Sequence, residues 1–102
     1  MDIRIGVAYG TDPELVLSLL EKVAGENGRV DKIPSPKAYF LGFGESSLDF
    51  RLLAWVDIEN RLGVESELNV AVNAVLKESN IEIPFPQRDL HVRSDATKRS
   101  DP

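Results

Sequence analysis

Three stretches of this chain are predicted to be strands, and apolar and polar side chains alternate in two of them. Residues 2–9 place an apolar side chain at every second position, a largely apolar stretch follows at 38–43, and the period of two returns over a longer run at 48–57. That period is typical of β-strands with one buried face. The tight connection at 44–47 joins the second and third stretches, so we predict that these two form an antiparallel hairpin. The buried face of the longest strand would carry Leu48, Phe50, Leu52, Ala54 and Val56.

The first helical pattern follows residue 10. Asp12 can cap this helix with Pro13 in its first turn, or Thr11 can cap it one residue earlier through a capping box with Glu14. Either alternative starts a helix at nearly the same place. Its apolar positions recur with helical spacing at Val16, Leu19, Leu20 and Val23.

The second helical pattern covers residues 61–79, and Asn80 stands where a left-handed residue commonly ends a helix. Asn69 and Asn73 lie one turn apart on this helix. They are either simply exposed or make polar contacts across an interface. The apolar positions of the helix are Val64, Leu68, Ala71, Val72, Val75 and Leu76.

The order of these elements, with a last alternating stretch near the C-terminus, is β-α-β-β-α-β. Each helix has one apolar stripe, so both should cover the same face of a small sheet. We therefore predict an α+β fold, the ferredoxin-like (split βαβ) sandwich. On the other sheet face Leu53 and Trp55 are too apolar for water, which favours contact with another chain or domain. Alternatively, Trp55 covers an edge of its own sheet.

The chain divides into three parts at its prolines and at its polar tail. Residues 1–83 form the α/β domain, residues 84–93 a proline-led extended segment with the last strand, and residues 94–102 a polar tail that is expected to be disordered. Pro84 and Pro86 lack backbone N–H groups and favour extended geometry. They should therefore carry the chain away from its own sheet.

Composition argues against several classes of function. The formal net charge is −5 and no basic stripe is present, which argues against binding nucleic acid or anionic lipid. The chain has no cysteine, so disulfides and thiol chemistry are excluded. No stretch approaches the ~20 apolar residues of a membrane-spanning helix, and the strand-like start argues against a signal peptide. We expect either a minimal protein or a domain of a longer one.

Candidate catalytic and metal-binding residues are sparse. His91 is the only histidine, and Asp89 beside it would make two ligands where zinc takes three or four. A Ser-His-Asp arrangement would need a strained nucleophile turn, and neither serine that could take part lies in one. The side chains that could complete such a triad are Ser46, Ser47, Asp49 and Asp89. We therefore expect no enzyme activity, no metal and no cofactor.

Two further motifs allow more than one interpretation. The stretch GFGESS at 42–47 has glycines and hydroxyls that can hold phosphate, but a strand follows it rather than a helix. A hairpin that needs positive φ angles explains the same glycines. Glu65, Glu67 and Glu78 on the second helix are interpreted as a solvated acidic face.

Four stretches stand out as a set. They are IGVAYGTDPELV (5–16), LGFGESSLDFRLLAWV (41–56), SELNVAV (66–72) and IEIPFPQRDLHV (81–92). In this order and spacing they resemble the C-terminal cytoplasmic α/β domain of the small-conductance mechanosensitive channel (MscS-like) family. The resemblance runs from Ile3 to about Arg93.

The resemblance implies a function. Members of that family are membrane channels that open under bilayer tension and release ions and small osmolytes during hypo-osmotic shock. Seven subunits build a hollow vestibule on the cytoplasmic side of the cell inner membrane. The implied partners are therefore further copies of the chain and, through transmembrane segments that it lacks, the membrane; no nucleic acid partner is implied.

The resemblance also implies a role for the last strand, because in the family this strand joins a parallel barrel between subunits. The residues that would pair in this way are Arg88, Asp89, Leu90, His91, Val92 and Arg93. The chain alone would not conduct and would serve as an assembly domain that walls the vestibule. The alternative is a ferredoxin-like small-molecule-binding regulatory module with 42–47 as its ligand loop. A hydrolase that uses His91 is a weaker third interpretation.

Overall fold

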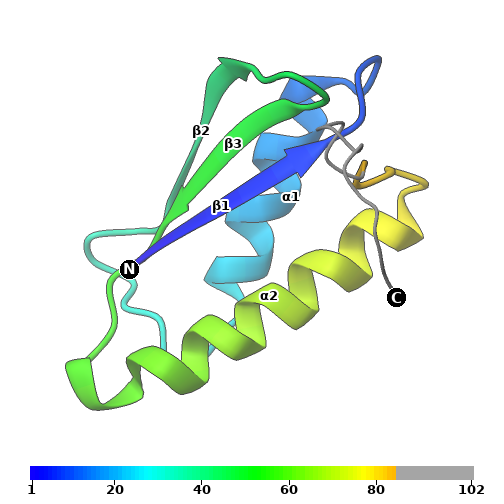
Figure 1. Cartoon of the computed structure of the whole chain (residues 1–102). Coiled ribbons are helices and arrows are strands. Elements are labelled where there is room, and N and C mark those ends of the chain that lie inside the picture. The colour runs from blue at the N-terminus through cyan, green and yellow to red at the C-terminus, as the bar shows by residue number, and fades with distance from the viewer. Residues whose placement is uncertain (85–102) are drawn as a thin grey trace, which may run out of the picture.

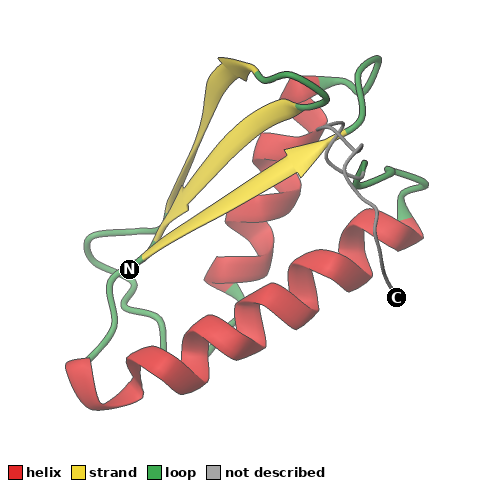
Figure 2. Ribbon diagram, in the orientation of Figure 1, coloured by secondary structure: helices red, strands yellow, loops and turns green. Residues whose placement is uncertain are grey.

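The computed structural model describes residues 1–84 (Figures 1 and 2). The predicted β-α-β-β-α order of this part is confirmed. The predicted strand at 88–93 and the tail at 94–102 lie outside the described residues. The elements are β1 (Asp2–Val7), α1 (Pro13–Gly25), β2 (Lys37–Phe43), β3 (Leu48–Leu53), a 3₁₀ turn (Ile58–Asn60) and α2 (Arg61–Glu78).

The three strands form one antiparallel sheet in the order β1-β3-β2. The predicted hairpin of β2 and β3 is therefore confirmed, and β1 joins the other side of β3. This is the arrangement of a ferredoxin-like fold, in which a last strand would lie beside β1. No strand occupies that position among the residues that the structure describes.

The central strand is shorter than predicted. It was expected over 48–57 but ends at Leu53, which pairs with Asp2 on one side and Lys37 on the other. These two residues are the first of β1 and of β2. Beyond Leu53 no other strand of residues 1–84 lies beside the chain, and a regular ladder ends where its partner strands begin. β1 likewise ends at Val7, which pairs with the first residue of β3.

Both helices contribute to one core on a single face of the sheet. In Figure 1, α1 lies behind the sheet and α2 passes along its lower side. Side chains of β1 and β3 alternate between buried and more exposed, and the buried set belongs to the same cluster as the helix stripes. The largest fully buried side chains are Phe50, Leu20, Leu52, Leu68, Leu76, Val7, Val16 and Val64. The predicted stripes hold, except that Leu19, Ala71 and Val75 are only partly buried.

The helix ends show which caps operate. An Asp12 side-chain oxygen accepts a hydrogen bond from the Glu14 N–H at 3.0 Å, so Asp12 caps α1. Thr11 instead donates its hydroxyl to the Ala8 carbonyl at 2.8 Å, which excludes the capping-box alternative. Asn80 has a φ of 59°, the left-handed conformation predicted for it.

Removing the α1 cap should destabilise the domain. We expect Asp12→Ala to lower the free energy of unfolding by about 1 kcal/mol, because the first-turn N–H groups lose an acceptor. Thr11→Ala is the matched control and should have a smaller effect, since its hydroxyl bonds a carbonyl outside the helix. Urea unfolding measures both variants. A larger loss in Thr11→Ala would show that Thr11 is the cap.

Candidate subunit interface

The sheet face opposite the helices carries three rows of side chains that cross all three strands. No helix or strand among residues 1–84 covers this open face. The first row is Asp2, Leu53 and Lys37, the second is Arg4, Arg51 and Tyr39, and the third is Gly6, Asp49 and Gly42. The first row therefore combines two charged side chains with an apolar one, the second is cationic and aromatic, and the third carries a single side chain, that of Asp49.

Asp2 neutralises the cationic row. Arg4 and Arg51 face each other across the strands, and like charges in that position are destabilising. An Arg51 Nη2 atom lies 3.0 Å from one Asp2 carboxylate oxygen, and Arg4 Nε lies 3.7 Å from the other. The hydrogen bond from Arg51 lowers the pKa of Asp2 and raises that of Arg51. The Asp2 carboxylate thus reduces the repulsion between the two guanidinium groups.

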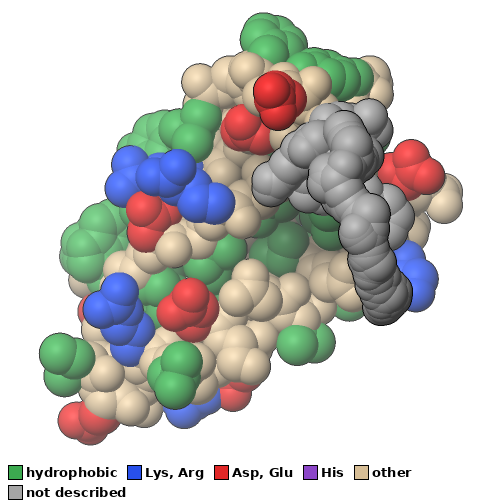
Figure 3. All heavy atoms as spheres, in the orientation of Figure 1, with side chains coloured by type: hydrophobic (Ala, Val, Ile, Leu, Met, Phe, Trp, Pro, Cys, Tyr) green, Lys and Arg blue, Asp and Glu red, His purple; other side chains and the backbone are tan. Residues whose placement is uncertain are grey.

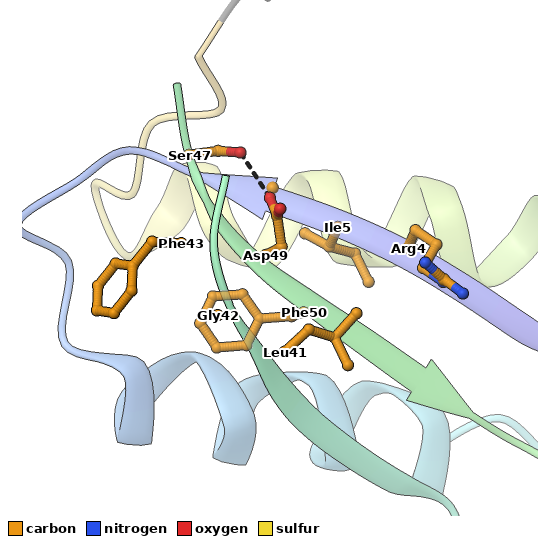
Figure 4. A pocket seen from close by; sticks show the side chains of 9 residues that line it. Arg4, Ile5, Leu41, Gly42, Phe43, Ser47, Asp49 and Phe50 are labelled. Atoms are coloured by element: carbon orange, nitrogen blue, oxygen red, sulfur yellow. Dashed lines mark hydrogen bonds between the residues drawn. The ribbon is translucent and has the colours of Figure 1, made fainter. Parts of the chain in front are cut away.

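A depression of 460 Å³ opens over the third row, beside the GFGESS stretch (Figure 4). Ser47 Oγ donates a hydrogen bond of 2.6 Å to Asp49 Oδ1, and both side chains stand at this depression. A Cβ atom on Gly44 would lie 2.5 Å from Asp49 Oδ2, and Gly42 has a φ of 141°. Hairpin geometry and the Asp49 side chain thus explain both glycines. A carboxylate that already engages the hydroxyl also makes this loop a poor phosphate site.

The outer strand β2 exposes a group of large apolar side chains, defined here as the β2 patch: Tyr39, Leu41 and Phe43. Tyr39 and Leu41 are each 50% exposed and Phe43 is 76% exposed. Hydrophobic side chains gather along the upper left margin of the molecule, over β2 (Figure 3). Tyr9 stacks on Phe43 and donates its hydroxyl to the Gly44 carbonyl. Exposed apolar clusters of this kind are typical of contact surfaces.

Sequence reasoning missed the β2 patch because a bulge interrupts the alternation of β2. The register shifts between Phe40 and Gly42, which adds Leu41 to the strand. Phe40 packs on the buried Phe50 with ring centroids 5.0 Å apart, whereas Leu41 lines the depression on the open face. The period of two therefore fails within AYFLGF, and only the register shows which side chains are free.

The four predicted interface residues lie on two separate surfaces. Leu53 is half-buried on the open face at the end of β3, and Trp55, 40% exposed, follows it outside the strand. The Trp55 carbonyl accepts the Asp31 N–H at 2.7 Å. Asn69 and Asn73 are exposed on α2, which packs on the opposite side of the sheet. Leu53 therefore belongs to the open face of the sheet, whereas Asn69 and Asn73 belong to a separate surface on α2.

The predicted barrel strand, Arg88 to Arg93 with His91 at its centre, lies outside the described residues. Within residues 1–84, no three His, Cys, Asp or Glu side chains come together as a metal site. None of the helices in this part is long and apolar enough to cross a membrane. Of the residues considered for a triad, Ser47 and Asp49 lie two positions apart at the start of β3, and the Ser47 hydroxyl donates to the Asp49 carboxylate.

Comparison with known families decides the identity. The family described as "Mechanosensitive ion channel MscS, C-terminal" matches residues 1–83. The chain belongs to the MscS family. The fold agrees, because the structure of Helicobacter pylori MscS in its closed state superposes with a TM-score of 0.79 at 32% identity over 93% of this chain.

Curated relatives place the chain within longer MscS family proteins. A family member of Haemophilus influenzae is 40% identical over 96 residues, which cover 93% of this chain and 9% of that protein. A Synechocystis member is 38% identical over 99% of this chain and 34% of its own length. The mechanosensitive channel MscK of Escherichia coli is 38% identical over 91% of this chain and 8% of its own length. The chain thus spans between less than a tenth and about a third of these relatives, and 38% of the H. pylori chain.

One residue of the predicted acidic face has a structural role in this MscS domain. Asn27 Nδ2 donates to Glu67 Oε1 at 2.9 Å, and an Arg29 Nη2 atom pairs with Glu67 Oε2. Glu67 therefore fastens α2 to the turn that follows α1. The hydrogen bond from Asn27 is the main cause that lowers the pKa of Glu67, and the Arg29 charge adds to it. Glu67 is exposed, as predicted for a solvated face, and in addition it bonds two residues of the turn after α1.

Neutralising Glu67 should change how stability depends on pH. The pKa of Glu67 is lower in the folded state than in the unfolded state, where it is near the ordinary value of 4.5. The ionised carboxylate therefore stabilises the fold fully above the unfolded-state pKa. This stabilisation is lost as the pH falls through the folded-state pKa. We expect Glu67→Gln to be less stable than wild type at pH 7 and the difference to vanish in acid. Chemical unfolding at several pH values measures it, with Glu78→Gln, on the same helix, as control. A difference that persists below both pKa values would contradict the ion-pair explanation.

Proposed function

We propose that this chain is the cytoplasmic assembly and vestibule domain of a mechanosensitive channel that releases ions and small osmolytes under membrane tension. The membership of residues 1–83 in the MscS C-terminal family carries the proposal. The uncovered open face and the β2 patch support it, since a domain that walls a chamber needs surfaces for its neighbours. By itself the domain does not conduct.

In the proposed assembly seven copies surround the pore axis on the cytoplasmic side of the cell inner membrane. Residues 88–93 of each copy pair with the same segment of its neighbours, because a closed ring of identical strands leaves no unpaired edge. Leu53, Trp55, Asn69 and Asn73 lie at contacts between domains. The domain catalyses no reaction, and its role is mechanical. Its contacts with neighbouring subunits bias channel opening only if they differ between the closed and open states.

Domain replacement tests the proposal. The chain is exchanged for the corresponding domain of H. pylori MscS, to which it is 32% identical, in cells that lack tension-gated channels. Survival of osmotic downshock and tension-activated currents in membrane patches are the readouts. We expect the chimera to protect the cells as the parent channel does. A channel that inserts and gates equally well with no C-terminal domain would contradict an assembly role.

The depression beside residues 42–47 gives the alternative function a location. A small-molecule regulatory module would bind its ligand there, with Asp49 and Arg4 as charged groups at the depression. Thermal shift of the chain with amino acids and nucleotides separates the two functions, because a true ligand raises the melting temperature by mass action. If no compound shifts the melting temperature and the chimera is functional, the regulatory module is excluded and only the channel function is supported.

A further inference from the structure

Among residues 1–84, the edge of β1 that faces away from β3 has a defined set of backbone groups without a strand partner. The Met1 carbonyl accepts the Ala54 N–H at 3.1 Å, next to the pair of Asp2 and Leu53. Because an antiparallel ladder alternates, the odd-numbered residues of β1 exchange hydrogen bonds with β3. The even-numbered residues Asp2, Arg4 and Gly6 therefore direct their N–H and C=O groups to the opposite edge.

One hydrogen bond joins this edge to the chain that leaves α2. The N–H of Ala8, the next even-numbered residue, donates to the Glu82 carbonyl at 2.8 Å. Ile81 beside it is buried, so the chain enters the position of a fourth strand. If this strand continued antiparallel to β1, Ala8 opposite Glu82 would set the register, with residue 84 opposite Gly6 and residue 86 opposite Arg4.

Both of those positions are proline. In that register the N–H groups of residues 84 and 86 would donate to the carbonyls of Gly6 and Arg4, but a proline has no N–H and its ring carbon stands in the place of the hydrogen. The other bond of that pair, from the Gly6 N–H to the Pro84 carbonyl, is also absent among the hydrogen bonds of residues 1–84. Within residues 1–84, the pairing of this segment with the β1 edge is therefore limited to the bond between Ala8 and Glu82.

The side chains alone would favour a fourth strand. Ile81, Ile83 and Phe85 alternate with Glu82, Pro84 and Pro86, so in the sequence the apolar set shares the parity of the buried Ile81, while Ile83 is 49% exposed in the structure. This is the pattern of a strand with one buried face. The obstacle to pairing with β1 therefore lies in the backbone, at two alternate positions on the side that would meet β1.

We propose that Pro84 and Pro86 determine pairing specificity by keeping the C-terminal segment off the β1 edge of its own domain, so that the segment is available to other copies. A shift of one residue would turn the prolines away from β1 but would also turn the apolar set out of the core. The chain therefore has no register on β1 that satisfies both. This inference extends the proposed assembly through residues 88–93 and rests on it for its purpose.

Hydrogen exchange of single amides tests the proposal in the complete chain. In wild type the amides of Arg4 and Gly6 should exchange much faster than those of Ile3 and Ile5, which face β3. In P84T/P86T two donors return to the edge, and we expect Arg4 and Gly6 to gain about tenfold or more in protection. Self-association measured by sedimentation should fall in the same variant, because its segment pairs within its own domain.

Pro36→Thr is the matched control, since it removes a proline from the loop before β2 and should change neither readout. If the double variant fails to fold, P84T alone restores one donor, opposite Gly6, and protection is read there. Equal protection of Gly6 in wild type and variant would overturn the proposal. Hydrogen exchange is measured at concentrations where the chain is monomeric, so its result decides the role of the prolines by itself. A wild-type chain that does not associate at any concentration would instead count against the proposed assembly.

Discussion

Phe50→Ala should lower the melting temperature by about 15–30 °C, which corresponds to about 3–5 kcal/mol for a buried phenylalanine. Phe50 is 0% exposed at the centre of β3, between Ile5 of β1 and Phe40 of β2. A domain of this size has a total stability on the order of 5–15 kcal/mol. The truncation therefore removes a large share of the free energy of unfolding, because a close-packed core does not fully refill the cavity that the ring leaves.

Phe43→Ala is the matched control for that prediction. It makes the same change in the same hairpin, but Phe43 is 76% exposed and loses mainly its contacts with Tyr9 and Phe40. Its effect should stay within about 1 kcal/mol. Differential scanning calorimetry measures both variants. Equal losses would mean that the core does not centre on Phe50.

The double variant Y39E/L41E should weaken association between copies by about tenfold to hundredfold while leaving the melting temperature nearly unchanged. Both side chains are half exposed in the β2 patch, so glutamates there meet water in the free domain and an apolar neighbour in the assembly. The effect should therefore appear in association and not in folding. Sedimentation over a range of concentrations measures it, and the domain-exchanged channel shows whether gating changes too.

Ile58→Glu serves as the control, because Ile58 is 86% exposed on the turn before α2, away from the β2 patch. It adds one negative charge, half that of Y39E/L41E, at an exposed apolar position. If it weakened association as much as Y39E/L41E, net charge rather than the β2 patch would be responsible. Unchanged association in Y39E/L41E would remove the patch from the assembly.

The candidate interface could be predicted only in part. The polar and apolar alternation of β3 identified Leu53 as an apolar side chain on the open face, and the structure places it there. Helical spacing put Asn69 and Asn73 on one exposed side of α2. The β2 patch was missed because a bulge breaks the alternation at Leu41. The partners of Glu67 were not predicted, because Asn27 and Arg29 lie about 40 residues away along the chain.

The sequence by itself determined the type and order of the described elements, the left-handed cap at Asn80 and most of the side chains that enter the core, because these follow from local periodicity and backbone chemistry. It left the cap of α1 open between Thr11 and Asp12, and the hydrogen bond from the Glu14 N–H decided for Asp12. Four stretches in a fixed order also determined the family. Only the tertiary structure decided where β3 ends and which edge of the sheet is free, because strand length and edge depend on where partner strands begin. The alternate prolines were expected from the sequence to carry the chain away from its sheet, but only the bond between Ala8 and Glu82 gives the register in which they would face β1.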